Sequence, residues 1–81
     1  MAQVIITPKA EKQYNRLSPT EQTKIKKKLV VLGNDSAAGK KLSGELAELR
    51  SLSAWPYRII YYIDKDKIFI TSMLHRQGAY Q

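Results

Sequence analysis

Three residues near the C-terminus carry side chains that can bind phosphate or move protons. They are His75, the only histidine in the chain, Arg76 and Tyr80. An imidazole has an ordinary pKa of about 6.5 and can transfer protons near neutral pH, whereas a phenol, at about 10, needs neighbouring cations to do so. A guanidinium matches the oxygens of a phosphate with paired donors. Taken alone, the three residues are equally typical of a polar surface at the end of a strand.

A fourth candidate, Arg58, lies in a segment rich in aromatic and β-branched residues that predicts a central strand. Side chains alternate between the two faces of a strand, and the odd-numbered residues of 57–63 are the more apolar set. We expect that set to face the core, which leaves Arg58 on an open face where a cation has no structural need to be. If Leu49 of the preceding strand faces inward, Arg50 joins Arg58 there. Glu48 then shares that face, and a salt bridge from it to either arginine is the structural alternative.

The net charge of +7 is concentrated in one part of the chain. Residues 24–41 hold six lysines against a single acid, a net of +5, while residues 1–23 and 42–81 each carry +1. The six are Lys24, Lys26, Lys27, Lys28, Lys40 and Lys41. A focused cationic surface attracts polyanions and steers them electrostatically. A lysine-rich helix face can also serve solubility alone, so the charge indicates either an anionic partner or a solvated face.

Start and stop signals divide the chain into one strand, two helices and three further strands. Thr7 is placed to cap a helix that begins at Pro8, and the Ser18–Glu21 capping box begins a second helix that ends at Gly33-Asn34. Strands are expected at 2–6, 45–53, 55–63 and 67–74, with a loop over 35–43. The order β-α-α-β-β-β predicts an α+β fold, with an N-terminal helical hairpin packed on one face of a mainly antiparallel four-stranded sheet.

Length and composition exclude several classes of protein. Eighty-one residues allow one small domain, 1–81, with no deep cleft between domains. Cysteine is absent, which excludes disulfides, a thiolate nucleophile and a cysteine metal site. The apolar runs are far shorter than the roughly 18 residues of a membrane span, and the N-terminus has no signal-peptide pattern. We therefore expect a compact, basic, cytoplasmic protein without a membrane segment.

Taken together, these segments resemble the RelE/ParE superfamily of bacterial and archaeal toxins from toxin–antitoxin pairs. The resemblance spans nearly the whole chain and is carried by Lys40-Lys41-Leu42-Ser43-Gly44, Leu49-Arg50, Tyr57–Ile63 and the terminal His75-Arg76-x-x-x-Tyr80. RelE-like members cut messenger RNA in the ribosomal A site, whereas ParE-like members lack the nuclease residues and poison DNA gyrase. The terminal pattern favours the RelE-like branch, a metal-independent endoribonuclease (mRNA interferase) that arrests translation. The alternatives are a ParE-like gyrase inhibitor and a catalytically lapsed basic RNA-binding relative.

The resemblance also implies roles for individual residues. The implied catalytic residues are Arg58, Arg76, Tyr80 and His75, and the implied RNA-binding residues are Lys40, Lys41, Arg50, Lys24 and Lys27. Cleavage by the RNA's own 2′-OH needs a base, stabilisation of a pentacoordinate phosphorus and an acid for the leaving 5′-oxygen. Arg58 and Arg76 would stabilise the charge. Tyr80 would act as acid or base or stack on a base, with His75 as its partner and Glu48 as a third candidate base.

Partners follow from the same resemblance. The toxin would be held inactive by a cognate acidic antitoxin that wraps around it by helix-in-groove and strand-addition contacts. The antitoxin would supply the DNA-binding part, so operator DNA would be bound only indirectly. Messenger RNA and the ribosome, with its 16S ribosomal RNA, would be the targets. No cofactor or metal is implied.

Overall fold

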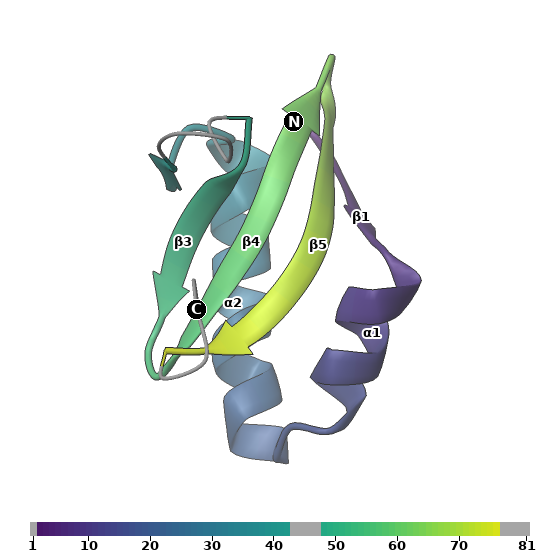
Figure 1. The fold of residues 1–81 in the computed structure, drawn as a ribbon, viewed down its shortest axis with the longest axis vertical. Helices are drawn as coiled ribbons and strands as arrows, with labels where there is room; N and C mark the ends of the chain where they lie inside the picture. The colour runs from purple at the N-terminus through teal and green to yellow at the C-terminus, as the bar shows by residue number, and fades with distance from the viewer. Residues whose placement is uncertain (1, 43–47, 77–81) are drawn as a thin grey trace.

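The computed structural model describes residues 2–42 and 48–76 and shows two helices packed on a mixed sheet (Figure 1). The elements are β1 (Gln3–Ile6), α1 (Pro8–Asn15), α2 (Pro19–Asn34), β2 (Lys40–Lys41), β3 (Arg50–Ala54), β4 (Tyr57–Asp64) and β5 (Lys67–His75). The strand order is β1-β5-β4-β3-β2, with β1 parallel to β5 and the other pairs antiparallel. The predicted α+β class is confirmed.

The strand count differs from the prediction, because the described part of the chain forms five strands in place of four. The additional strand is β2, within the segment that was expected to be a loop, where Lys40 pairs with Ser51 and Lys41 with Arg50. Two residues are too few to show the alternation that marks a strand in a sequence. Pairing with the edge of β3 creates this strand, and it places two lysines beside the sheet.

Capping explains where the helices begin. The predicted capping box is present, since the Ser18 hydroxyl accepts from the Glu21 amide and the Glu21 carboxylate accepts from the Ser18 amide. Thr7 holds the N-cap position of α1, but its hydroxyl makes no cap and instead donates to the Ile70 carbonyl at 2.7 Å. This hydrogen bond ties the start of α1 to β5.

The two helices take different positions on the sheet. In Figure 1, α2 lies behind β3 and β4, while α1 lies at the side of β5 below β1. Beyond the end of β1, α1 covers the edge of β5, and the Gln13 side-chain oxygen accepts from the Met73 amide at 2.6 Å. One face of the sheet therefore packs against α2, and on the other, which we call the open face, no helix lies within the described residues.

The core lies between the two helices and the sheet. Its fully buried members include Ala10, Ile25, Leu32, Ile59, Tyr61, Ile68 and Ile70. Ile59 and Tyr61 are two of the odd-numbered residues that were expected to face inward, whereas Ile63 is 36% exposed near the end of β4. No helix in the described ranges is both long and apolar enough to cross a membrane.

The condition under which Arg50 would join Arg58 on the open face is not met. Arg50 pairs with Tyr61 and Leu52 with Ile59, so Arg50 shares the face that packs against α2. Leu49, the residue before β3, instead lines a hollow on the open face. The sequence did not decide between the two registers, because Leu49 and Leu52 fall on opposite faces of the strand.

Candidate functional site

A cationic hollow beside β2 and β3 is the strongest candidate for a functional site. Arg58 is exposed on the open face of β4, opposite Ser53 on β3 and Leu74 on β5. The hollow has a volume of about 570 Å³ and is lined by Lys28, Ala38, Lys40, Lys41, Leu42, Ser51, Leu52, Ser53 and Arg58. Among the residues that the structure describes, four cations thus surround one space and no acid lines it. Such a space suits a phosphate group.

Contacts of Tyr61 hold the backbone just before the two β2 lysines of this cationic hollow. The fully buried Tyr61 hydroxyl accepts from the Gly39 amide at 2.9 Å and donates to the Ser36 carbonyl at 3.0 Å. A Cβ added at Gly39 would lie 2.6 Å from that hydroxyl oxygen, so only glycine fits there. Arg50 Nη1 donates to the Gly39 carbonyl at 3.1 Å. Arg50 therefore supports the backbone before Lys40 and does not join Arg58 on the open face.

Burial also sets the protonation of Tyr61. Removal of its phenol from water raises its pKa, and the Gly39 amide and the nearby Arg50 charge oppose that rise. The phenol is therefore neutral near pH 7, as its hydrogen bond to the Ser36 carbonyl requires. Tyr61 serves as a structural anchor for β2.

Arg76 lies at the other end of the open face, directly after β5. Its amide donates to the Pro56 carbonyl at 2.8 Å, and its guanidinium carbon lies 4.5 Å from the centroid of the Trp55 ring. Trp55 remains 64% exposed and is joined to Pro56 by a cis peptide bond. The sequence interpretation overlooked Trp55. The signal was a lone tryptophan next to a proline, in a turn that leads into Arg58.

His75 is oriented differently from Arg58. Its ring makes an edge-to-face contact with Tyr57, with centroids 5.3 Å apart and planes at 86°, and it pairs with Tyr57 across the sheet. That register places both side chains on the face that carries α2. Burial, and then a hydrogen bond to Glu21, raise the pKa of Tyr57. His75 and Arg58 are therefore not brought together by the strands, and a proton-transfer role for His75 stays a prediction.

The remaining predicted residues fall in three places. Tyr80 lies outside the described residues, so its catalytic role stays a prediction. Lys24 and Lys27 are exposed on α2, the helix that covers the face opposite Arg58. Glu48 is exposed just before β3. A neighbouring lysine that was not singled out as a site residue, Lys28, is half-buried and lines the cationic hollow instead.

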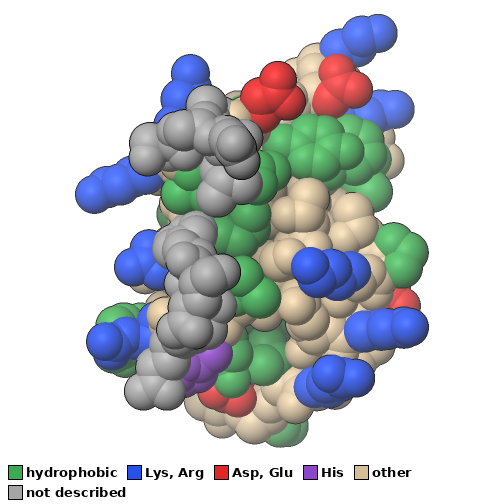
Figure 2. Space-filling model, in the orientation of Figure 1, with side chains coloured by type: hydrophobic (Ala, Val, Ile, Leu, Met, Phe, Trp, Pro, Cys, Tyr) green, Lys and Arg blue, Asp and Glu red, His purple; other side chains and the backbone are tan. Residues whose placement is uncertain are grey.

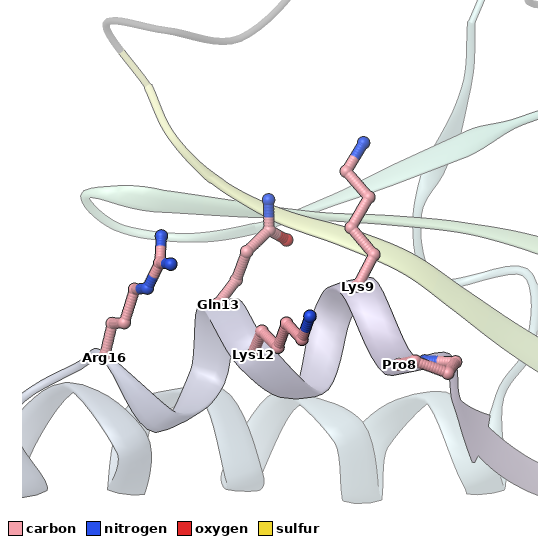
Figure 3. A pocket seen from close by; sticks show the side chains of 5 residues that line it. All are labelled: Pro8, Lys9, Lys12, Gln13 and Arg16. Atoms are coloured by element: carbon pink, nitrogen blue, oxygen red, sulfur yellow. The ribbon is translucent and has the colours of Figure 1, made fainter.

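A second cationic surface lies on α1. Pro8, Lys9, Lys12, Gln13 and Arg16 line a hollow of about 380 Å³ (Figure 3). In that view the side chains of Lys9, Gln13 and Arg16 extend toward β5, and blue side chains gather over α1 in Figure 2. This surface was not predicted, because the net charge of residues 1–23 is low. The signal was the spacing of three and four residues, which puts Lys9, Lys12 and Arg16 on neighbouring helical turns.

The floor between these two surfaces is largely apolar. A hollow of about 410 Å³ on the open face is lined by Lys9, Leu42, Leu49, Ile60, Thr71, Ser72 and Leu74. Figure 2 shows hydrophobic side chains along the middle of this face, with lysine and arginine side chains on both flanks. Cations that flank an apolar floor can bind phosphates at the rims and bases between them. Within residues 2–42 and 48–76, no three His, Asp or Glu side chains gather where they could hold a metal ion.

Comparison with known proteins places this arrangement in a family. Residues 4–80 match the family model described as the ParE toxin of type II toxin-antitoxin system, parDE. The RelBE2 toxin–antitoxin complex of Mycobacterium tuberculosis contains a similar chain at 26% identity and a TM-score of 0.86, with 93% of this chain and 98% of that chain covered. The intact RelBE complex of E. coli gives 26% identity, a TM-score of 0.74 and coverage of 93% and 96%.

Two further results complete the comparison. The YoeB dimer of Staphylococcus aureus shares the fold at 22% identity and a TM-score of 0.75, with 91% and 95% of the two chains covered. No curated protein matches the sequence. The family match covers nearly all of the chain, and the solved structures agree with it over the whole fold. The chain therefore belongs to the RelE/ParE superfamily and is the toxin of a type II toxin–antitoxin system.

Proposed function

We propose that this toxin is a ribosome-dependent endoribonuclease that cleaves messenger RNA in the A site and so arrests translation in the cytoplasm. The observation that carries the proposal is the cationic hollow, which Arg58 lines from the open face together with Lys40 and Lys41 of β2 and Lys28 of α2. A gyrase inhibitor needs no such cationic site on its sheet. The RelE and YoeB toxins among the structural neighbours support the same choice.

The proposed reaction is an attack by the RNA's own 2′-OH on the adjacent phosphorus. A base takes the 2′-OH proton, the new P–O2′ bond forms, and the P–O5′ bond breaks as an acid protonates the leaving oxygen. The products are a 2′,3′-cyclic phosphate and a 5′-OH. Arg58 and Arg76 stabilise the additional negative charge on phosphorus, because guanidinium groups match phosphate oxygens. Tyr80 is the proposed acid or base, and His75 is the second candidate for that role.

The proposed partners divide between the two faces of the sheet. Lys40 and Lys41 bind the messenger RNA beside Arg58, and Arg50 contributes indirectly by fixing the backbone before them. Lys24 and Lys27 are exposed on α2, do not line that site and are proposed to dock 16S ribosomal RNA. In this arrangement the ribosome supplies the second wall that a small open sheet lacks.

The antitoxin is proposed to cover the edge formed by β1 and α2. An apolar groove of about 490 Å³ is lined there by Ala2, Val4, Ile6, Lys26, Leu29, Val30, Gly33 and Asn34. Ile6 is 37% and Val30 65% exposed, and β1 is the free edge of the sheet. An acidic antitoxin segment would bury this groove, pair with β1 and face the lysines of α2. Operator DNA would then be bound through the antitoxin.

A gyrase inhibitor is the second candidate function, and the ParE family match favours it. If the toxin inhibits gyrase, Arg58 and Arg76 have no assigned role. Its action should then cause DNA damage in place of translation arrest. A basic RNA-binding relative without cleavage is the third. Such a protein would bind RNA at the cationic hollow but would release no cleavage product.

The test is cleavage of messenger RNA on programmed ribosomes, with the 5′ ends of the products mapped. Wild-type protein is expected to cut in frame with the A site, and Arg58→Ala is expected to lose cleavage by about 100-fold or more, as for a lost charge-stabilising donor. Lys67→Ala removes one exposed cation outside the site and serves as the matched control. In-frame cuts that persist in Arg58→Ala, or supercoiling inhibition without cuts, would contradict the proposal.

A further inference from the structure

The turn between β3 and β4 and the end of β5 form a small aromatic–cationic stack. The guanidinium of Arg76 lies over the Trp55 ring at 4.5 Å, within the range of a cation–π interaction. The Arg76 amide donates to the carbonyl of Pro56, the residue after Trp55, at 2.8 Å. The main chain and the side chain of Arg76 therefore both hold it against the turn formed by Trp55 and Pro56. This turn directly follows Ala54–Tyr57, the last residue pair between β3 and β4.

The Trp55 ring is exposed although it carries this arginine. At 64% exposure it has the largest apolar surface left open in the described chain, since the similarly exposed Val30 is a much smaller side chain. Tryptophan at the surface is typical of interfaces, where its ring contributes a large contact area at low entropic cost. A guanidinium over the face of a ring can still direct N–H groups from its edge toward a phosphate.

We propose that Trp55 stacks on an unpaired nucleobase of single-stranded RNA while Arg76 binds a phosphate beside that base. The proposal rests on the proposed RNA-directed function and adds a base-binding position at the end of the sheet. Every nucleobase has a π-face, so this contact tolerates sequence but requires an unpaired strand. The two strand residues nearest the turn on the open face are Ser53 and its partner Arg58. An RNA held at Trp55 therefore leads toward Arg58 and the cationic hollow.

Trp55 is the only tryptophan in the chain, so its fluorescence reports on this position alone. The probe is an eight-nucleotide single-stranded RNA that is 2′-O-methylated and cannot be cleaved. The comparison probe is an abasic oligonucleotide of the same length and phosphate number. Binding of each is followed by the anisotropy of a terminal dye at low salt. At saturation, the base-bearing probe is expected to quench and shift the tryptophan emission, and the abasic probe is not.

Variants separate stacking from charge. Trp55→Ala is expected to weaken binding of the base-bearing probe by about 5- to 100-fold, the range for loss of one stacked base. Its affinity for the abasic probe and its salt slope are expected to stay unchanged, because no charge is removed. Trp55→Phe should retain most of the affinity. Val31→Ala, which also trims an exposed apolar side chain, is the matched control.

Three results would overturn the inference: no binding of the base-bearing probe, saturated binding with unchanged emission, or an equal loss of affinity for both probes in Trp55→Ala. Because the probe is not cleavable, these results do not depend on nuclease activity. A toxin that cuts messenger RNA on ribosomes but shows unchanged Trp55 emission refutes the stacking role and leaves the proposed function intact. Quenching by a protein that cuts nothing supports stacking and refutes the nuclease.

Discussion

At the scale of single residues, Tyr61 links the core to the cationic hollow. Its buried hydroxyl makes hydrogen bonds to the backbone of Ser36 and Gly39, just before β2. Tyr61→Phe leaves a buried amide and a carbonyl without partners, which is expected to lower the free energy of unfolding by about 1–3 kcal/mol. Urea denaturation measures this change. Tyr14→Phe, which loses only a long 3.5 Å contact to Gln22, is the control and should change stability less.

The same phenol predicts a dependence of stability on alkaline pH. The pKa of Tyr61 is raised by burial, whereas in the unfolded chain it lies near its usual value of about 10. The folded state therefore holds the proton more tightly, so this contribution is complete below pH 10 and is lost as pH rises through the raised folded value. Wild-type stability should fall faster than that of Tyr61→Phe above pH 10. Parallel curves for the two proteins would show that the phenol does not titrate with unfolding.

Two glycines give a matched pair of substitutions with opposite expected signs. Gly39→Ala places a Cβ 2.6 Å from the Tyr61 hydroxyl and 2.9 Å from the Ser51 carbonyl, so the backbone must shift, at a cost of about 1–3 kcal/mol. Gly33→Ala adds a methyl group inside α2 with its nearest neighbours at 3.7 Å, which should stabilise the helix by about 1 kcal/mol. Thermal unfolding distinguishes the two. Equal changes in thermal stability for the two substitutions would mean that the segment before β2 is not tightly packed.

At the scale of elements, α1 acts as a continuation of the sheet edge. Where β1 ends, Gln13 accepts from the Met73 amide and so satisfies a donor that a longer strand would have paired. Gln13→Ala is expected to lower the free energy of unfolding by about 1–3 kcal/mol and to speed hydrogen exchange at Met73. Lys12→Ala, on the same helix and exposed, should have little effect. Unchanged exchange at Met73 in Gln13→Ala would contradict this role.

The elements themselves were largely predictable from sequence, because their signals are local. Proline at the first helical position, the Ser18–Glu21 capping box and β-branched runs located both helices and the long strands. The short β2 and the orientation of Arg50 were not predictable. Both depend on the contacts among Tyr61, Gly39 and Arg50, which join residues 11 to 22 positions apart.

The candidate site, like the fold, was predictable from sequence only in part. Arg58 was placed on the open face by simple alternation along β4, and the structure agrees. The other residues of the candidate site were harder to predict from the sequence. Lys28 reaches the cationic hollow from α2, and Arg76 meets Trp55 only because β5 returns beside the β3–β4 turn. Both contacts are tertiary, so no spacing within one element reveals them.

At the scale of the whole molecule, the positive charge is distributed over two faces with different expected partners. Lys24, Lys26 and Lys27 belong to α2, behind the sheet, while Lys9 and Lys12 of α1 and Arg16 directly after it flank the open face that carries Arg58. Each set contributes +3 to the net charge of +7. If net charge alone drew RNA to the toxin, removing either set would have the same effect. If the faces have separate partners, the two losses will differ.

Two triple variants of equal charge test this separation. For free single-stranded RNA, neutralising Lys9, Lys12 and Arg16 to alanine is expected to reduce the slope of log affinity against log salt by up to about 2, because each released phosphate contact contributes about 0.7. Neutralising Lys24, Lys26 and Lys27 should leave that slope nearly unchanged but weaken binding to intact ribosomes, where α2 is proposed to meet ribosomal RNA. Both variants keep the buried core, so circular dichroism should show the wild-type fold. Identical slopes for both variants on both targets would mean that the toxin senses polyanions through its total charge, and the assignment of messenger RNA to the open face would then have to rest on Arg58 alone.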